Sequence, residues 1–175
     1  MNREILFRGK EINNEKWHYG DLLRFGNKRY INICPRFVDE YIVEEDKIAL
    51  YSFGNFIEVI PETIGRYTGL TDRNGVKIFE GDIVELFVFR GQIIQMCGAF
   101  GVSVEPAIDW DYLASEINPV TGCDNSPFFC QNDNFVSLWE LMWNYNQEEN
   151  MCDVIEVIGN IHDNPELLGG IENKS

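Results

Sequence analysis

Cysteine, histidine and carboxylate side chains are the groups in this sequence that could do chemistry. The 175-residue chain holds five cysteines, and none of them forms a C-x-x-C pair. Cys123 and Cys130 are the closest two, and the six residues between them make a looser spacing than that of paired zinc-binding cysteines. We therefore predict that the thiols are buried or unreactive and that they form no metal site.

The two histidines lie in apolar surroundings, His18 between Trp17 and Tyr19 and His162 directly after Ile161. These positions favour structural or surface roles for both histidines. A catalytic Cys–His dyad would need a cysteine and a histidine that are distant in the sequence to lie together in the folded chain. The pair Gly98 and Gly101 lacks the Lys-Ser/Thr that follows a phosphate-binding loop. No catalytic, metal-binding or cofactor-binding residue is predicted, and we do not expect an enzyme.

Aromatic residues are a second group that could bind a partner, because exposed rings stack well on peptides and on unpaired bases. Packing in the core is the competing interpretation for most of them. Trp17 and Tyr19 form one pair of this kind. The candidate interaction surface consists of four later residues: Trp110, Tyr112, Trp139 and Trp143.

Charge is distributed unevenly along the chain, whose formal net charge is −15. Residues 1–90 hold 13 Lys+Arg and 15 Asp+Glu, whereas residues 91–175 hold one base, Lys174, and 14 acids. The second half should repel nucleic acid and anionic lipid, so we do not expect direct binding to either. Its acids could serve solubility, meet a basic partner or imitate the charge of DNA.

The sequence contains no run of about 18 apolar residues, which a membrane-spanning helix would need. The residues that follow Met1 lack the apolar core of a secretion signal. We therefore expect a cytoplasmic protein.

Short apolar runs separated by glycine corners predict a mainly β protein with short helical insertions. Asn74-Gly75 predicts a type I′ hairpin, and Gly81-Asp82 a tight corner. Residues 83–89 are predicted to form a strand that is buried on both faces. Arg90-Gly91 is predicted to turn the chain after it. The other predicted strands cover residues 4–9, 17–25, 29–34, 38–43, 48–53, 64–70, 92–96, 100–104, 128–130 and 153–161.

Two short helices are predicted in the second half. One begins at Pro106 and runs to Ile117. The other covers residues 137–145, where Leu138 and Leu141 belong to a stripe with helical spacing and Ser137 has the form of a capping residue. Such short elements favour a small barrel or a strongly bent sheet.

Several segments together resemble the YopX family of phage and prophage proteins. They are REILFRG at 3–9, WHYGDLL at 17–23, PETIGRYTGL at 61–70, TDRNGVKIFEGDIV at 71–84, GAFGV at 98–102 and EVIGNIHDNPELL at 156–168. The resemblance implies an SH3-type barrel over residues 61–168, an N-terminal β segment over 1–60 and an insertion at about 106–150. Residues 169–175 should form a flexible tail, because the ends of a chain fray. It supplies no activity and no catalytic residues.

Three functions compete on this basis. The first is a non-enzymatic accessory protein of phage or prophage origin that binds a protein partner or assembles into a homo-oligomer. The second is an acidic DNA mimic that inhibits a DNA-binding protein. The third is an enzyme with an unrecognised site, which would need titratable groups that converge on a pocket.

Overall fold

The computed structural model describes residues 5–33, 55–86, 89–96, 98–104, 135–139, 141, 151–152 and 154–168. The chain divides into two compact units, Met1–Arg66 and Tyr67–Ser175, which we call the N-terminal and C-terminal units. The boundary falls within strand β5 (Gly65–Asp72). The predicted domain limits at residues 60 and 168, and the insertion between them, stay predictions.

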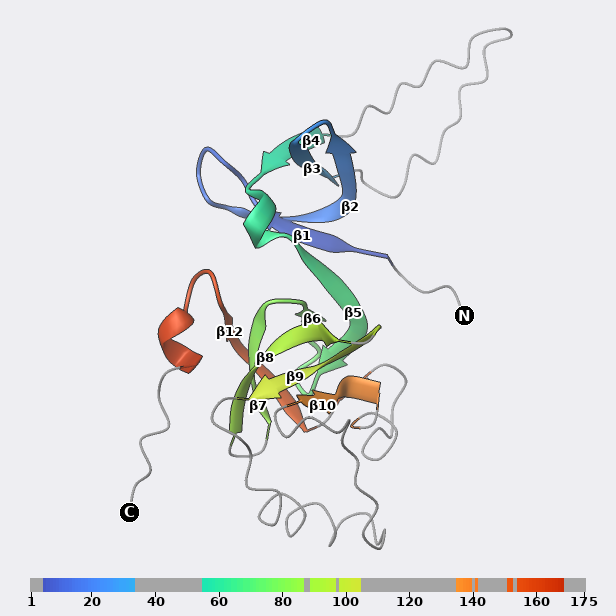
Figure 1. Ribbon diagram of the computed structural model, residues 1–175, viewed down its shortest axis with the longest axis vertical. Helices are drawn as coiled ribbons and strands as arrows, with labels where there is room; N and C mark the ends of the chain where they lie inside the picture. Colours follow the sequence, from blue (N-terminus) through green and yellow to red (C-terminus); the bar gives the residue numbers. More distant parts are fainter. Residues whose placement is uncertain are drawn as a thin grey trace, which may run out of the picture. The chain divides into compact units, whose positions relative to one another are not determined.

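Four antiparallel strands form the sheet of the N-terminal unit, in the order β1-β2-β3-β4 (Figure 1). They are β1 (Phe7–Lys10), β2 (Trp17–Phe25), β3 (Lys28–Ile33) and β4 (Asn55–Val59). A short 3₁₀ turn, η1 (Pro61–Thr63), follows, and β5 (Gly65–Asp72) pairs with β1 through Gly65 and Arg66. The predicted strand over 17–25 is confirmed residue for residue.

This sheet is strongly curled, so that its last strand returns to the end of its first. Glu11 and Val59 form a single antiparallel bridge, and the Ile60 amide donates to the Lys10 carbonyl at 2.8 Å. Gly20 permits the bend, because a side chain there would collide with the Asn32 carbonyl oxygen. The described pairings contain no continuous ladder that closes a barrel.

Five strands form the main sheet of the C-terminal unit, in the order β10-β9-β8-β7-β12. They are β7 (Asp82–Leu86), β8 (Phe89–Met96), β9 (Ala99–Val104), β10 (Phe135–Ser137) and β12 (Ile155–Asn160). From Tyr67 onward β5 forms an antiparallel pair with β6 (Lys77–Phe79) and a parallel pair with β11 (Met151–Cys152). A 3₁₀ turn, η2 (Pro165–Leu168), comes last. The prediction of a mainly β protein is confirmed.

Branched aliphatic residues fill the core of the C-terminal unit. They come from every strand of the five-stranded sheet, from β6 and from the residues after β10: Ile78, Val84, Leu86, Ile93, Val102, Val104, Val136, Leu138, Leu141 and Ile155. Burial of each such side chain is worth about 1.5–3 kcal/mol, so this cluster is the main stabilising element of the unit.

The predicted continuous strand over 83–89 is wrong. Leu86 pairs directly with Phe89, so the chain reverses between them. Gly91 does not turn the chain but lies inside β8, where a side chain would come within 2.5 Å of the Ser103 carbonyl and the Val102 side chain. The glycine is needed for this close approach of two strands, which sequence alone cannot distinguish from a turn.

The hairpin predicted at Asn74-Gly75 is confirmed as the β5–β6 pair, but the predicted type I′ turn is wrong. Within the described residues, Gly75 has a positive φ of 78° and Asn74 does not, whereas type I′ needs both. The Gly75 amide donates to the Asp72 carbonyl at 2.9 Å, and the Asp72 amide donates to the Val76 carbonyl at 2.8 Å. This pattern fits the three-residue hairpin loop in which glycine forms the bulge.

Asp72 explains why this longer loop is stable. Its fully buried carboxylate accepts hydrogen bonds through Oδ1 from the amides of Asn74 and Val76, each at 2.8 Å. Oδ2 accepts a third, from the amide of Val157 on β12 at 2.9 Å. The Arg73 amide donates to the Ile155 carbonyl, and an ion pair joins Arg73 to Glu156. The side chain thus fixes the β5–β6 hairpin against the edge of the five-stranded sheet.

The remaining predicted elements have mixed outcomes. Residues 135–137 are strand β10, where no strand was predicted, and Ser137 is its last residue. Leu138 and Leu141 are buried, as the predicted stripe requires. The final strand is confirmed as β12, with shorter bounds than 153–161. The predicted strands at 38–43, 48–53 and 128–130 and the helix at 106–117 lie outside the described residues.

Replacing Asp72 with Ala should lower the free energy of unfolding by about 3 kcal/mol or more, because three amides lose their acceptor and each unmet buried group costs about 1–3 kcal/mol. Urea denaturation measures the change. Asp21→Ala, at an exposed position on β2, is the control and should change stability by less than about 0.5 kcal/mol. Equal effects of the two substitutions would refute the bridging role.

Replacing Gly91 with Ala should cost about 1–3 kcal/mol, because the added methyl group overpacks the β8–β9 pair. Gln95→Ala, at an exposed position of the same strand, is the matched control and should be close to neutral. Thermal unfolding of the two variants tests this. A neutral Gly91→Ala would show that the strands can separate without penalty.

Candidate interaction surface

The register of β2, β3 and β4 places large apolar side chains on the face of the N-terminal sheet that lies opposite its core. Leu23 opposes Tyr30, and Asn32 opposes both Asp21 and Phe56. Residues two apart on a strand share a face. We call the following five residues the outer face: Tyr19, Leu23, Phe25, Tyr30 and Phe56.

Four of these side chains are substantially exposed: Tyr19 (48%), Leu23 (42%), Phe25 (80%) and Phe56 (42%). Tyr30 is half-buried. On the opposite face Ile31 and Val59 are completely or almost completely buried. The sheet therefore has apolar residues on both faces, although a solvated sheet normally carries polar residues on its open side.

Charged residues border the outer face. The Lys28 ammonium donates to a Glu58 oxygen at 2.8 Å. The pKa of Lys28 is raised, first by this hydrogen bond and then by the attraction of the carboxylate. Asp21 is exposed between Tyr19 and Leu23 on the same strand. The outer face therefore carries charged groups both at its edge and, at Asp21, among its apolar side chains.

At the other end of β2, Trp17 holds two basic side chains that are almost fully buried. The Arg8 guanidinium lies 4.8 Å from the centre of the Trp17 ring, and the Lys10 ammonium lies 5.6 Å from it. Arg8 is 6% exposed and Lys10 is 8% exposed. The side chains of Arg8, Lys10 and Trp17 share one face of the sheet, and this cation–π stack joins β1 to β2 there.

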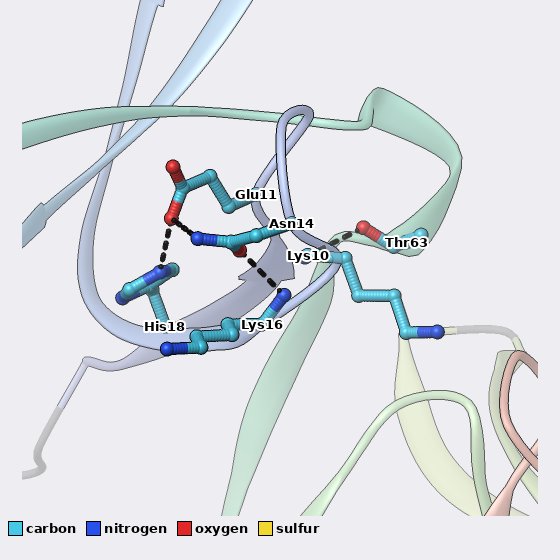
Figure 2. Close-up of polar contacts among 6 residues, drawn as sticks. All are labelled: Lys10, Glu11, Asn14, Lys16, His18 and Thr63. Carbon is cyan, nitrogen blue, oxygen red and sulfur yellow. Dashed lines mark hydrogen bonds and ion pairs between the residues drawn. The ribbon is translucent and has the colours of Figure 1, made fainter.

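A polar network orders the loop between β1 and β2 (Figure 2). A hydrogen bond of 2.9 Å joins His18 Nε2 to Glu11 Oε2, and Asn14 Nδ2 donates to the same oxygen at 3.0 Å. The Lys16 amide donates to Asn14 Oδ1 at 2.9 Å. The hydrogen bond from His18 is the main cause of a lowered pKa at Glu11. His18 therefore has a structural role in this loop, as the sequence indicated.

Thr63 attaches the 3₁₀ turn η1 to β1. The Lys10 amide donates to Thr63 Oγ1 at 2.9 Å (Figure 2). The Thr63 hydroxyl in turn donates to the Ile60 carbonyl at 2.7 Å. The side chain is buried. Thr63 Oγ1 therefore supplies an acceptor for the Lys10 amide, so this amide is not an unmet buried donor at the bend before β5.

Of the four aromatic residues predicted as an interaction surface, the structure places one. Trp139, two residues after β10, is 62% exposed. Trp110, Tyr112 and Trp143 lie outside the described residues, so this surface stays a prediction. Residue type alone pointed to Tyr19 and not to Leu23, Phe25 and Phe56. Both alternating sets of residues 17–25 contain apolar side chains, which indicates that one apolar set is exposed but not which one.

The described ranges contain no group of three or more His, Cys, Asp or Glu residues arranged to hold a metal ion. They also contain no helix with the length and apolar character needed to cross a bilayer.

The fold and this surface define a mainly β protein of two units with an exposed apolar sheet face. The family model described as YopX protein matches residues 6–169. The chain therefore belongs to the YopX family, which confirms the resemblance seen in its sequence segments. No curated protein matches the chain.

The Glu11–His18 pair predicts a pH dependence of stability. Because the pKa of Glu11 is lower in the folded chain, its contribution is present above the unfolded pKa and is lost as pH falls through the folded pKa. The stability difference between wild type and Glu11→Gln should therefore shrink from about pH 6 to about pH 3. Thermal unfolding across this range measures it.

Glu15→Gln alters an exposed acid of the same loop and serves as the control. Its difference from wild type should vary less with pH. A Glu11→Gln difference that stays constant, or that grows in acid, would contradict the assigned hydrogen bond.

Proposed function

We propose that this YopX-family protein is a non-enzymatic interaction module of phage or prophage type that binds protein through its outer face. The observation that carries the proposal is the exposure of Tyr19, Leu23, Phe25 and Phe56 on one face of an ordered sheet. Exposed apolar groups that adjoin one another mark binding surfaces, whereas isolated ones are ordinary.

The sheet also supports binding because it holds these side chains in place. Each belongs to a strand that pairs with at least one neighbour, and β3 pairs on both sides. A surface that is already ordered loses little conformational entropy when a partner docks. Aromatic residues supply large contact areas with few rotatable bonds. A protein partner therefore suits this face better than a small substrate.

The proposal includes three finer features. The SH3-type barrel is proposed for residues 61–168, where the five-stranded antiparallel sheet of the C-terminal unit supports it. The protein acts in the cytoplasm. It does not bind nucleic acid or membranes directly, because its net charge of −15 opposes contact with phosphate groups.

Replacing Leu23 and Phe56 together with Ser should abolish specific partner capture, since it removes apolar contact area from the centre of the outer face. Full-length tagged wild type and variant are compared as baits in bacterial lysate, with quantitative mass spectrometry of the captured proteins. Both side chains are partly exposed, so the variant should keep its strand content by circular dichroism.

Val76→Ser is the matched control, because Val76 is a similarly exposed apolar residue (48%) of the C-terminal unit. It should capture what wild type captures. The proposed function fails if the Leu23/Phe56 variant captures the same proteins in the same amounts as wild type.

A further inference from the structure

The tip of the β2–β3 hairpin places two arginines directly opposite each other. Arg24 on β2 pairs in register with Arg29 on β3, and the turn between the strands contains Gly26 with φ 58°. Like charges at directly opposed positions destabilise a strand pair. The hairpin therefore carries an electrostatic cost that a bound anionic group would remove.

Among the residues that the structure describes, the hydrogen bonds of these arginines go to backbone carbonyls and not to carboxylates. Arg24 Nε donates to the Gly26 carbonyl at 3.4 Å, and Arg29 Nη1 donates to the Lys28 carbonyl at 3.1 Å. Throughout the described ranges, no acidic side chain forms an ion pair with either guanidinium. Arginine forks match the geometry of carboxylates, so this pair is suited to acidic side chains of a partner.

An exposed apolar side chain lies at the same end of the hairpin. Phe25 is 80% exposed and is the most exposed large apolar side chain of the described residues. It projects from the opposite face of β2 to Arg24, because successive residues of a strand alternate between faces. Arginine and aromatic residues are the usual composition of binding hot spots, so a partner that covers the end of the hairpin can contact both. Arg24, Phe25, Lys28 and Arg29 are called the hairpin tip below.

The chain itself provides an acidic partner. The N-terminal unit holds 10 Lys+Arg and 11 Asp+Glu, a net charge of −1, whereas the C-terminal unit holds 4 and 18, a net charge of −14. A contact between two identical tips would bring four arginines together, so a symmetric contact is disfavoured. A contact from the tip of one copy to the acidic unit of another has complementary charge.

We propose that the hairpin tip binds the C-terminal unit of a second copy of this chain, so that copies associate head to tail. This inference rests on the proposed interaction function and names one partner for it. A contact of this kind is heterologous, and each added copy offers a new tip and a new acidic unit. The association should be weak and sensitive to salt, because few residues and mostly exposed charges form it.

Sedimentation velocity of the full chain at several concentrations tests the proposal. Wild type should associate at about 0.05 M salt and dissociate at about 0.5 M salt. Arg24→Ala with Arg29→Ala should weaken self-association by at least about tenfold. Its thermal stability should be unchanged or higher, because the like-charge pair is gone. Phe25→Ser is the second variant and should weaken association without altering charge.

Lys16→Ala with Arg66→Ala is the matched control, since it removes two exposed bases of the same unit outside the tip. It should associate as wild type does. In a mixing experiment, fluorescently labelled double-arginine variant should still bind unlabelled wild type, because the variant keeps its acidic unit. Failure of that mixed complex would show a tip-to-tip contact and overturn the head-to-tail arrangement.

The proposal is also overturned if wild type stays monomeric at low salt, or if the double-arginine variant associates as well as wild type. Tight binding of a labelled single-stranded oligonucleotide, lost in the same variant, would assign the tip to nucleic acid instead. If wild type stays monomeric but captures partners through Leu23 and Phe56, the proposed function holds and only this further inference fails.

Discussion

The register of β2, β3 and β4 is the constraint on which the surface of the N-terminal unit depends. Leu22, Ile31 and Ile57 oppose one another on the core side, and Ile31 is fully buried. A slip of one residue would exchange the two faces and expose that core. The burial that fixes the register therefore also determines that Leu23 and Phe25 face outward. The outer face and the paired arginines at the hairpin tip follow from the same alignment.

Buried carboxylates have an architectural role in the C-terminal unit. Asp72 joins its own hairpin loop to β12, and Asp82, which is 1% exposed, accepts a hydrogen bond from the Phe79 amide at 2.7 Å. Each occupies a turn where backbone amides have left the ladder and need an acceptor. In a chain this rich in acids, these two aspartates serve the fold, and their burial does not indicate catalysis.

The sequence predicted the strands whose apolar pattern is unambiguous. The prediction was wrong where one residue type can serve two structural purposes. The strand over 17–25 was predicted correctly, as was the corner at Gly81. Gly91 was misread because a glycine that permits close strand contact looks like a glycine that turns the chain. For the surface, residue type alone favoured tryptophans. The exposure of Leu23 and Phe25 could not be predicted, because both alternating sets of β2 contain apolar residues and only tertiary packing selects the buried one.

We propose that the outer face and the hairpin tip are the contact surfaces of this protein. A two-dimensional NMR titration of isotope-labelled chain with its own unlabelled copy at low salt tests this. Shifts and broadening are expected at Leu23, Phe25, Arg29 and Phe56, with Ile31 and Val59 on the buried face nearly unchanged. Shifts that are absent from β2 and β3, or that are confined to other parts of the chain, would contradict it.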